Sequence, residues 1–174
     1  GGAVAAVFGL IIGLPALRLK GDYLAIVTLA FGEIIRTVLS SQPLEKAFGG
    51  PQGLSVKTYS DSLFVVSFVV LIFMLFIVQN FIRSKHGRAI TAIRDNEIAA
   101  RASGINVTYY KLLVFVVAAF FAGVAGVLYG HGVTPIKSGA FSYNYSIQML
   151  VMVVLGGLGS LNGSIVAAAA LTYL

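Results

Sequence analysis

The stretch SLFVVSFVVLIFMLFIVQNFI, residues 62–82, contains 21 uncharged residues in a row and lies between Asp61 and Arg83. At about 1.5 Å of rise per residue, a helix of this length covers about 31 Å, the hydrocarbon thickness of a bilayer. The stretch therefore predicts a membrane-spanning helix.

The composition of the 174 residues also favours a membrane environment, since 58% of them are hydrophobic and only 10% are charged. Roughly a quarter of the residues in a soluble domain are charged, so this chain lacks the polar groups that cover a water-exposed globule. The absence of cysteine excludes a disulfide scaffold, a Cys-ligated zinc site, an iron–sulfur cluster and a thiol nucleophile. Because the sequence begins at Gly1 and stops inside an apolar run, we expect it to be part of a longer polypeptide.

Further apolar runs predict an all-α fold, a polytopic transmembrane helical bundle that forms a single partial domain over residues 1–174. The run 112–130 is uncharged and long enough to cross a bilayer. Its small residues at four-residue spacing predict a helix-packing seam, which comprises Ala119, Ala122, Gly123, Gly126 and Gly130. The spans are expected at about residues 1–17, 23–42, 62–82, 111–130 and 147–174.

The last of these spans is expected to be Gly-broken or re-entrant. No charge follows Lys137, and the uncharged run is interrupted by GGLGSLNG, residues 156–163. Each glycine forfeits up to about 1 kcal/mol of helix propensity relative to alanine. The cluster predicts either a break that lines a translocation route or close packing against a neighbouring helix, and it supplies the candidate pathway residues Gly156, Gly157, Gly159 and Gly163.

The basic residues predict the orientation of the chain, because lysine and arginine are retained in short cytoplasmic loops. Eight of them fall in residues 18–22 and 83–111, whereas three fall in residues 43–61 and 131–146. The first pair of connections is therefore expected in the cytoplasm and the second pair outside. This topology explains the net charge of +6, so lipid is an expected partner and nucleic acid is not.

The cytoplasmic loop 83–110 is longer than a tight connection requires, and long ordered connections usually have a function. Asp95 is a suitable N-cap and Gly104 a suitable left-handed stop, which together predict a helix of about two turns over residues 96–103. Thr108 is expected to cap the next helix. The short helix could rest on lipid headgroups or dock in a protein groove, and its small apolar face, formed by Ile98, Ala99 and Ala102, favours the groove.

Two charged residues inside a predicted span, Glu33 and Arg36, form a second candidate site. They are three positions apart, close enough to pair on one helix. Charges inside a membrane usually pair or face an interior. The pair is therefore interpreted either as part of a translocation pathway or gate, or as an ion pair near the helix end. No metal site is expected, because His86 and His131 have no ligand motif around them.

The run GRAITAIRDNEIAARASGINVTYYKLLVFVVAAFFAGVAGVLYG, residues 87–130, resembles the permease subunit of branched-chain amino acid ATP-binding-cassette importers of the LivM type. The segments LPALRLKGDYLAIVTLAFGEI (14–34), GGPQGLS (49–55) and SIQMLVMVVLGGLGSLNGS (146–164) agree with it in the same order. The resemblance implies that the cytoplasmic loop docks on an ATPase subunit as a coupling helix. The expected coupling residues are Arg94, Asp95, Asn96, Glu97, Ile98, Ala99, Ala100 and Gly104.

The resemblance also implies a function, namely translocation of branched-chain, apolar amino acids across the inner membrane of a bacterium or archaeon. The expected partners are a second permease subunit of the LivH type, two ATP-binding subunits and an extracytoplasmic binding protein. This chain lacks a G-x-x-x-x-G-K-[ST] motif, so we expect it to bind no cofactor, to have no catalytic residue and to leave ATP hydrolysis to a partner. The alternatives are a passive solute channel and an ion-driven secondary transporter.

Overall fold

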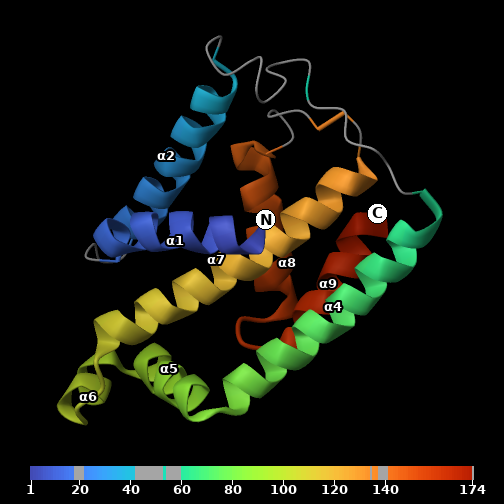
Figure 1. The fold of residues 1–174 in the computed structure, drawn as a ribbon. Helices are drawn as coiled ribbons and strands as arrows, with labels where there is room; N and C mark the ends of the chain where they lie inside the picture. Colours follow the sequence, from blue (N-terminus) through green and yellow to red (C-terminus); the bar gives the residue numbers. More distant parts are fainter. Residues whose placement is uncertain (18–21, 42–52, 54–59, 134, 137–140, 174) are drawn as a thin grey trace. The chain divides into compact units, whose positions relative to one another are not determined.

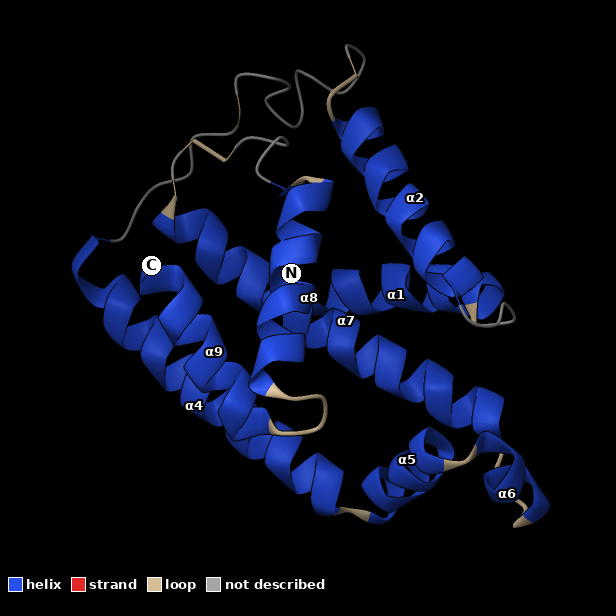
Figure 2. Cartoon of the chain, turned by 180° about the vertical axis from the view of Figure 1, so that it is seen from behind, coloured by secondary structure: helices blue, strands red, loops and turns tan. Residues whose placement is uncertain are grey.

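The computed structural model describes residues 1–17, 22–41, 53, 60–133, 135–136 and 141–173 of the chain. The elements of these ranges are all helices, so the prediction of an all-α fold is confirmed (Figure 2). The helices, labelled as in Figure 1, are α1 (Gly2–Ala16), α2 (Asp22–Leu39), α4 (Ser60–Arg83), α5 (Lys85–Asp95), α6 (Glu97–Ala102), α7 (Val107–Gly132), α8 (Tyr143–Gly156) and α9 (Leu161–Tyr173).

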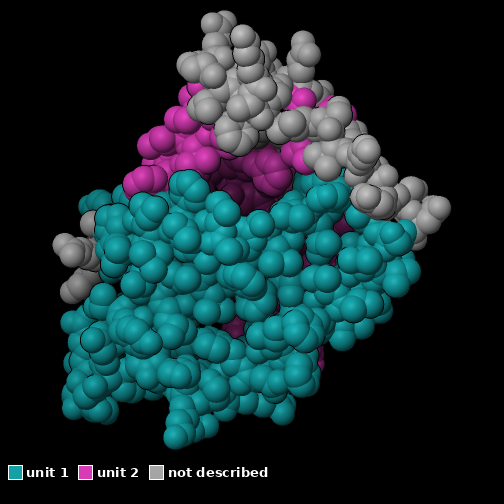
Figure 3. Space-filling model, in the orientation of Figure 1, with its two compact units in different colours: residues 1–28, 55–134 teal, residues 29–54, 135–174 magenta. Residues whose placement is uncertain are grey.

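Several predictions fall outside the described residues. They concern the basic connection at residues 18–21, most of the outer connection at residues 43–61 with its GGPQGLS segment, and Lys137. The described chain divides into two compact units, coloured separately in Figure 3. Residues 1–28 and 55–134 form one unit, and residues 29–54 and 135–174 form the other.

Two helices of the first unit are long and apolar enough to cross a membrane. They are Ser62–Arg83 of α4, with 22 residues, and α7, with 26 residues. Large apolar side chains of α4, among them Phe64 and Phe73, are exposed. A core helix of a soluble protein buries such side chains, whereas a helix in lipid exposes them to the acyl chains. The composition of α4 and the exposure of its side chains are therefore both those of a membrane helix.

Helices α1 and α7 pack against each other through small residues (Figure 1). A Cβ atom added to Gly9 of α1 lies only 2.6 Å from the Cβ of Ala119, and one added to Gly123 of α7 collides with Ala5. Residues without bulky side chains allow two backbones to approach closely, and the resulting van der Waals packing favours helix association in lipid. The predicted seam on α7 is thus confirmed at Ala119 and Gly123, and α1 supplies the facing small residues. The prediction was wrong at Gly126, because a Cβ there meets nothing within 4 Å.

Helices α5 and α6 connect α4 to α7 within the first unit. A Cβ on Gly132, at the end of α7, lies 3.6 Å from Leu63 near the start of α4. At their other ends α4 and α7 diverge, and α5 and α6 fill the interval (Figures 1 and 2). The chain therefore presents a small helical segment at the ends where α4 and α7, the two longest helices of the described residues, diverge.

The second unit contains the predicted break. Helix α8 ends at Gly156 and α9 begins at Leu161, with positive φ angles of 93° at Gly157 and 103° at Gly159. The chain turns back there and α9 packs against α8 (Figure 1). At 14 and 13 residues, these helices extend only about 21 and 20 Å, less than a bilayer core. The predicted Gly-broken segment is confirmed, and its re-entry into the membrane stays a prediction.

Candidate functional site: the helical segment between α4 and α7

The site begins with a helix that the sequence analysis missed. Residues Lys85–Asp95 form α5, whose N-cap Ser84 accepts a hydrogen bond of 3.3 Å from the backbone N–H of Gly87. A serine followed by apolar residues at three-residue spacing, Ile90 and Ile93, was the signal that could have revealed it. The loop 83–110 is therefore mostly helical.

Asn96, and not Asp95, caps the short helix α6. Its backbone is extended, and its side-chain oxygen accepts hydrogen bonds of 3.0 Å from the N–H groups of Ile98 and Ala99. The prediction of Asp95 as the cap was wrong because α5 continues through Asp95, which leaves Asn96 as the first residue free to leave helical geometry. Asp95 instead accepts a charge-assisted hydrogen bond of 3.1 Å from Arg94.

The end of α6 follows the prediction. Gly104 has a φ of +80°. This left-handed conformation is strained for a residue with a Cβ atom but not for glycine. The N–H groups of Gly104 and Ile105 donate to the carbonyls of Arg101 and Ala100 at 3.0 and 3.1 Å. These bonds satisfy carbonyl groups that a helix end leaves without partners.

Helix α7 begins at Val107, two residues after Ile105. Asn106 caps it by accepting a hydrogen bond of 3.1 Å from the N–H of Tyr109, so the prediction of Thr108 as the cap was wrong. Asparagine precedes the hydroxyl residue along the chain, and its longer side chain reaches the first turn from the extended position.

One face of α6 packs inward and the other is open. Ala100 is 3% exposed and forms a small core with Ile93 of α5 and Val107 of α7. On the opposite side Ile98 is 81% exposed, and Ala99 and Ala102 are exposed beside it. The predicted apolar face is therefore present, and it faces away from the described chain.

Glu97 stands at the first position of α6 and uses both carboxylate oxygens. Oε1 accepts a hydrogen bond of 2.7 Å from Arg101, and Oε2 accepts one of 2.7 Å from the ammonium group of Lys111 in α7. The hydrogen bond from Lys111 lowers the pKa of Glu97 below its ordinary value of 4.5, and the charges of Lys111 and Arg101 act in the same direction. Glu97 is therefore ionised at neutral pH.

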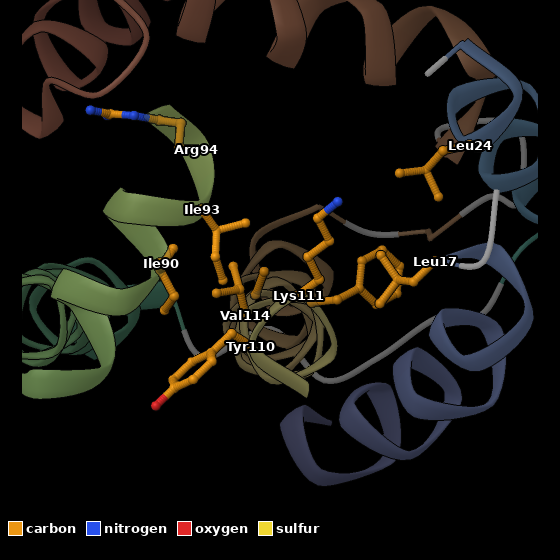
Figure 4. A pocket seen from close by; sticks show the side chains of 10 residues that line it. Leu17, Leu24, Ile90, Ile93, Arg94, Tyr110, Lys111 and Val114 are labelled. Atoms are coloured by element: carbon orange, nitrogen blue, oxygen red, sulfur yellow. The ribbon is translucent and has the colours of Figure 1, made fainter. Parts of the chain in front are cut away.

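A hollow of about 410 Å³ lies between α5 and α7, next to this segment (Figure 4). Its wall is mostly apolar, with side chains from α5, α7 and the neighbouring ends of α1 and α2. Ile93, Val114 and Leu17 are among them. Lys111 also lines the hollow, so this lysine lies between an apolar surface and the carboxylate of Glu97.

The second candidate site, on α2, contains the expected pair. Arg36 donates to the Glu33 carboxylate, with a distance of 2.9 Å from Nε to Oε1. The two charges are therefore paired on one helix, as the interpretation of an ion pair predicts. A role in a pathway stays a prediction.

The four glycines of the break form two pairs, and a glycine is needed in each pair for a different structural reason. Gly157 and Gly159 adopt the left-handed backbone of the turn. Gly156 and Gly163 face each other across it, because a Cβ on either would collide with the backbone of the other helix. Two glycines therefore make the break and two allow close packing, and a role of the break in a translocation route stays a prediction.

The fold and this segment define an all-helical membrane protein that carries a short, capped helix between two long apolar ones. The chain belongs to the family described as the branched-chain amino acid transport system / permease component, which matches residues 1–174.

Among similar proteins are two high-affinity branched-chain amino acid transport system permease proteins LivM. The one from Salmonella typhimurium is 35% identical and the one from Escherichia coli 34% identical, each over 96% of this chain and 47% of the relative. A probable branched-chain amino acid transport permease protein LivM from Methanocaldococcus jannaschii is 27% identical over 92% of this chain and 50% of its own length. The chain thus spans about half the length of these relatives. No solved structure matches it.

Proposed function

We propose that the chain is the membrane-spanning part of a permease subunit of an ATP-binding-cassette importer for branched-chain amino acids. The observation that carries this proposal is α6, a helix capped at both ends whose apolar Ile98 projects away from the described chain. An exposed apolar side chain on a fixed helix suits a groove in a partner protein. Membership of the permease family supports the same function.

The proposal assigns the energy source to other chains. Two ATP-binding subunits bind and hydrolyse ATP, so this chain needs no cofactor and no catalytic residue of its own. A second permease subunit completes the pathway, and an extracytoplasmic binding protein delivers the amino acid and sets most of the selectivity. The complex belongs in the inner membrane of a bacterium or archaeon, and this chain crosses it several times.

The coupling site comprises the residues that form, cap or flank α6. Closure of the ATPase subunits moves α6, and α4 and α7 tilt with it. The site consists of Arg94, Asp95, Asn96, Glu97, Ile98, Ala99, Ala100 and Gly104.

An experiment on Ile98 tests this function. In Ile98→Glu, a charge replaces the apolar side chain in the groove, and burying an unpaired charge is costly. We expect loss of at least about tenfold in affinity for the ATPase, together with loss of ATP-dependent leucine uptake in vesicles. Folding is unaffected because Ile98 is exposed. Arg101→Gln, away from the apolar face, is the matched control.

The same vesicles distinguish the alternatives. Uptake by the unaltered chain that persists without the ATPase subunits identifies a channel, and uptake that follows an ion gradient identifies a secondary transporter. Either outcome overturns the proposal.

We further propose that the turn between α8 and α9, with Gly156, Gly157, Gly159 and Gly163, lines the translocation route. Unwound backbone at membrane depth persists only where protein or water satisfies it. A cysteine at Ser160 is then expected to react with water-soluble thiol reagents, and leucine should slow that reaction. A cysteine that is unreactive from both sides contradicts this role.

The pair Glu33 and Arg36 is proposed as a gate on the same route. If it is one, Glu33→Gln lowers uptake without lowering the amount of assembled complex. Unchanged uptake shows instead that the two residues form a structural ion pair.

A further inference from the structure

The two ends of α6 are held by different kinds of interaction. At its C-terminal end, backbone hydrogen bonds from Gly104 and Ile105 tie the helix to the turn that leads into α7. At its N-terminal end, Asn96 is the only residue between α5 and α6, and its extended backbone interrupts the helix. The orientation of α6 therefore depends on what else holds its first turn.

Glu97 makes that contact. It is the first residue of α6, and its Oε2 atom lies 2.7 Å from the Nζ atom of Lys111, in the second turn of α7. These residues are 14 positions apart, whereas each remaining ion pair of the described residues joins side chains at most four positions apart. The Glu97–Lys111 pair thus connects two helices, and the local pairs do not.

The apolar contact alone cannot define the direction of α6. Ala100 meets Ile93 and Val107 with a single methyl group, and the hydrogen bonds from Gly104 and Ile105 hold the C-terminal end of α6. The ion pair adds a second contact, one turn towards the N-terminus of α6. A contact at each end of a helix fixes the direction of its axis, whereas contacts at one end do not.

We propose that Glu97 and Lys111 form a clamp that holds α6 in one orientation relative to α7, so that a displacement of α6 by a partner is passed to α7. Both are positioning residues, because they act on the helices and not on the transported solute. This inference rests on the proposed function for its consequence, since a partner must push on α6. The clamp itself is a property of this chain and can be measured without the ATPase.

Spin labels test the clamp directly. The chain has no cysteine, so cysteines at Ile98 in α6 and Ala125 in α7, both exposed, are the only labelling sites introduced. In Lys111→Met, which keeps the apolar stem but removes the charge, we expect a broader distribution of label distances. Lys111→Arg, which restores the charge, should return the narrow distribution.

The chain offers a matched control for this measurement. Arg101→Gln removes the other partner of Glu97 but leaves the link to α7 intact, so its distance distribution should stay narrow. If Lys111→Met gives the same narrow distribution as Arg101→Gln, the clamp is overturned.

Transport measurements test the consequence. In complexes that contain the ATPase, Lys111→Met should bind the ATPase normally, but the leucine carried per ATP hydrolysed should fall severalfold, and Lys111→Arg should restore the ratio. An unchanged ratio overturns transmission through the clamp. If the unaltered complex shows no ATP-dependent uptake, the proposed function fails, while the distance distributions still decide on the clamp.

Discussion

At the scale of single residues, Asn96 decides where α5 ends and α6 begins. Its side chain accepts two hydrogen bonds from the first turn of α6, and replacing such a cap by alanine costs about 1 kcal/mol. We expect Asn96→Ala to speed hydrogen exchange at the amides of Ile98 and Ala99 by about fivefold. Asn96→Asp keeps a hydrogen-bond acceptor, so in this variant the same two amides should exchange as they do in the unaltered chain. Equal rates in both variants would show that the cap contributes nothing.

Also at the scale of single residues, the ionisation of Glu97 should make the orientation of α6 depend on pH. Because its pKa in the folded chain lies below 4.5, its contribution to stability is complete above pH 4.5 and is lost as the pH falls through the folded-state pKa. Lys111 and Arg101 are the charged groups that face it. The label distances between α6 and α7 should be constant from about pH 7 to about pH 5 and broaden below pH 4.5. Glu97→Gln should show no such transition, and a transition in that variant contradicts the assignment.

At the scale of elements, the packing of α1 on α7 depends on which glycine faces the partner helix. A Cβ at Gly123 collides with Ala5, whereas one at Gly126 meets nothing within 4 Å. We expect Gly123→Ala to destabilise the chain by about 1–3 kcal/mol, the usual cost of overpacking. Gly126→Ala should be neutral or stabilising by up to about 1 kcal/mol through helix propensity. Thermal unfolding in detergent measures the effect of both substitutions. Equal shifts of the unfolding temperature would contradict the seam.

The helices α8 and α9 show how far composition alone defines an element. Four glycines predicted an interruption, and the positive φ angles of Gly157 and Gly159 provide it. The close approach of Gly156 and Gly163 could not be predicted, because it depends on the direction in which α9 leaves the turn.

At the scale of the whole molecule, the basic residues predict that the segment from α5 to α6 faces the cytoplasm. In a chain without native cysteine, a cysteine at Ser103 should react with a membrane-impermeant reagent only after the membrane is opened. A cysteine at Ser142 should react in intact cells. Labelling of Ser103 from outside contradicts the topology, and with it the docking of α6 on an ATPase inside the cell.

Sequence alone determined the class of this protein, because long runs without charge have few stable states outside a bilayer, and it marked helix ends at Gly104 and in the cluster 156–163, because glycine adopts a positive φ without strain. It also placed α6 to within a residue and identified Ile98, Ala99 and Ala102 as one face.

Only the tertiary structure decided that Ala100 points inward, that Asn96 caps α6, and that Glu97 reaches Lys111. Each of these outcomes depends on where α5 ends and on how α6 and α7 are oriented. Contacts between different helices follow from packing in three dimensions, which local sequence patterns do not specify.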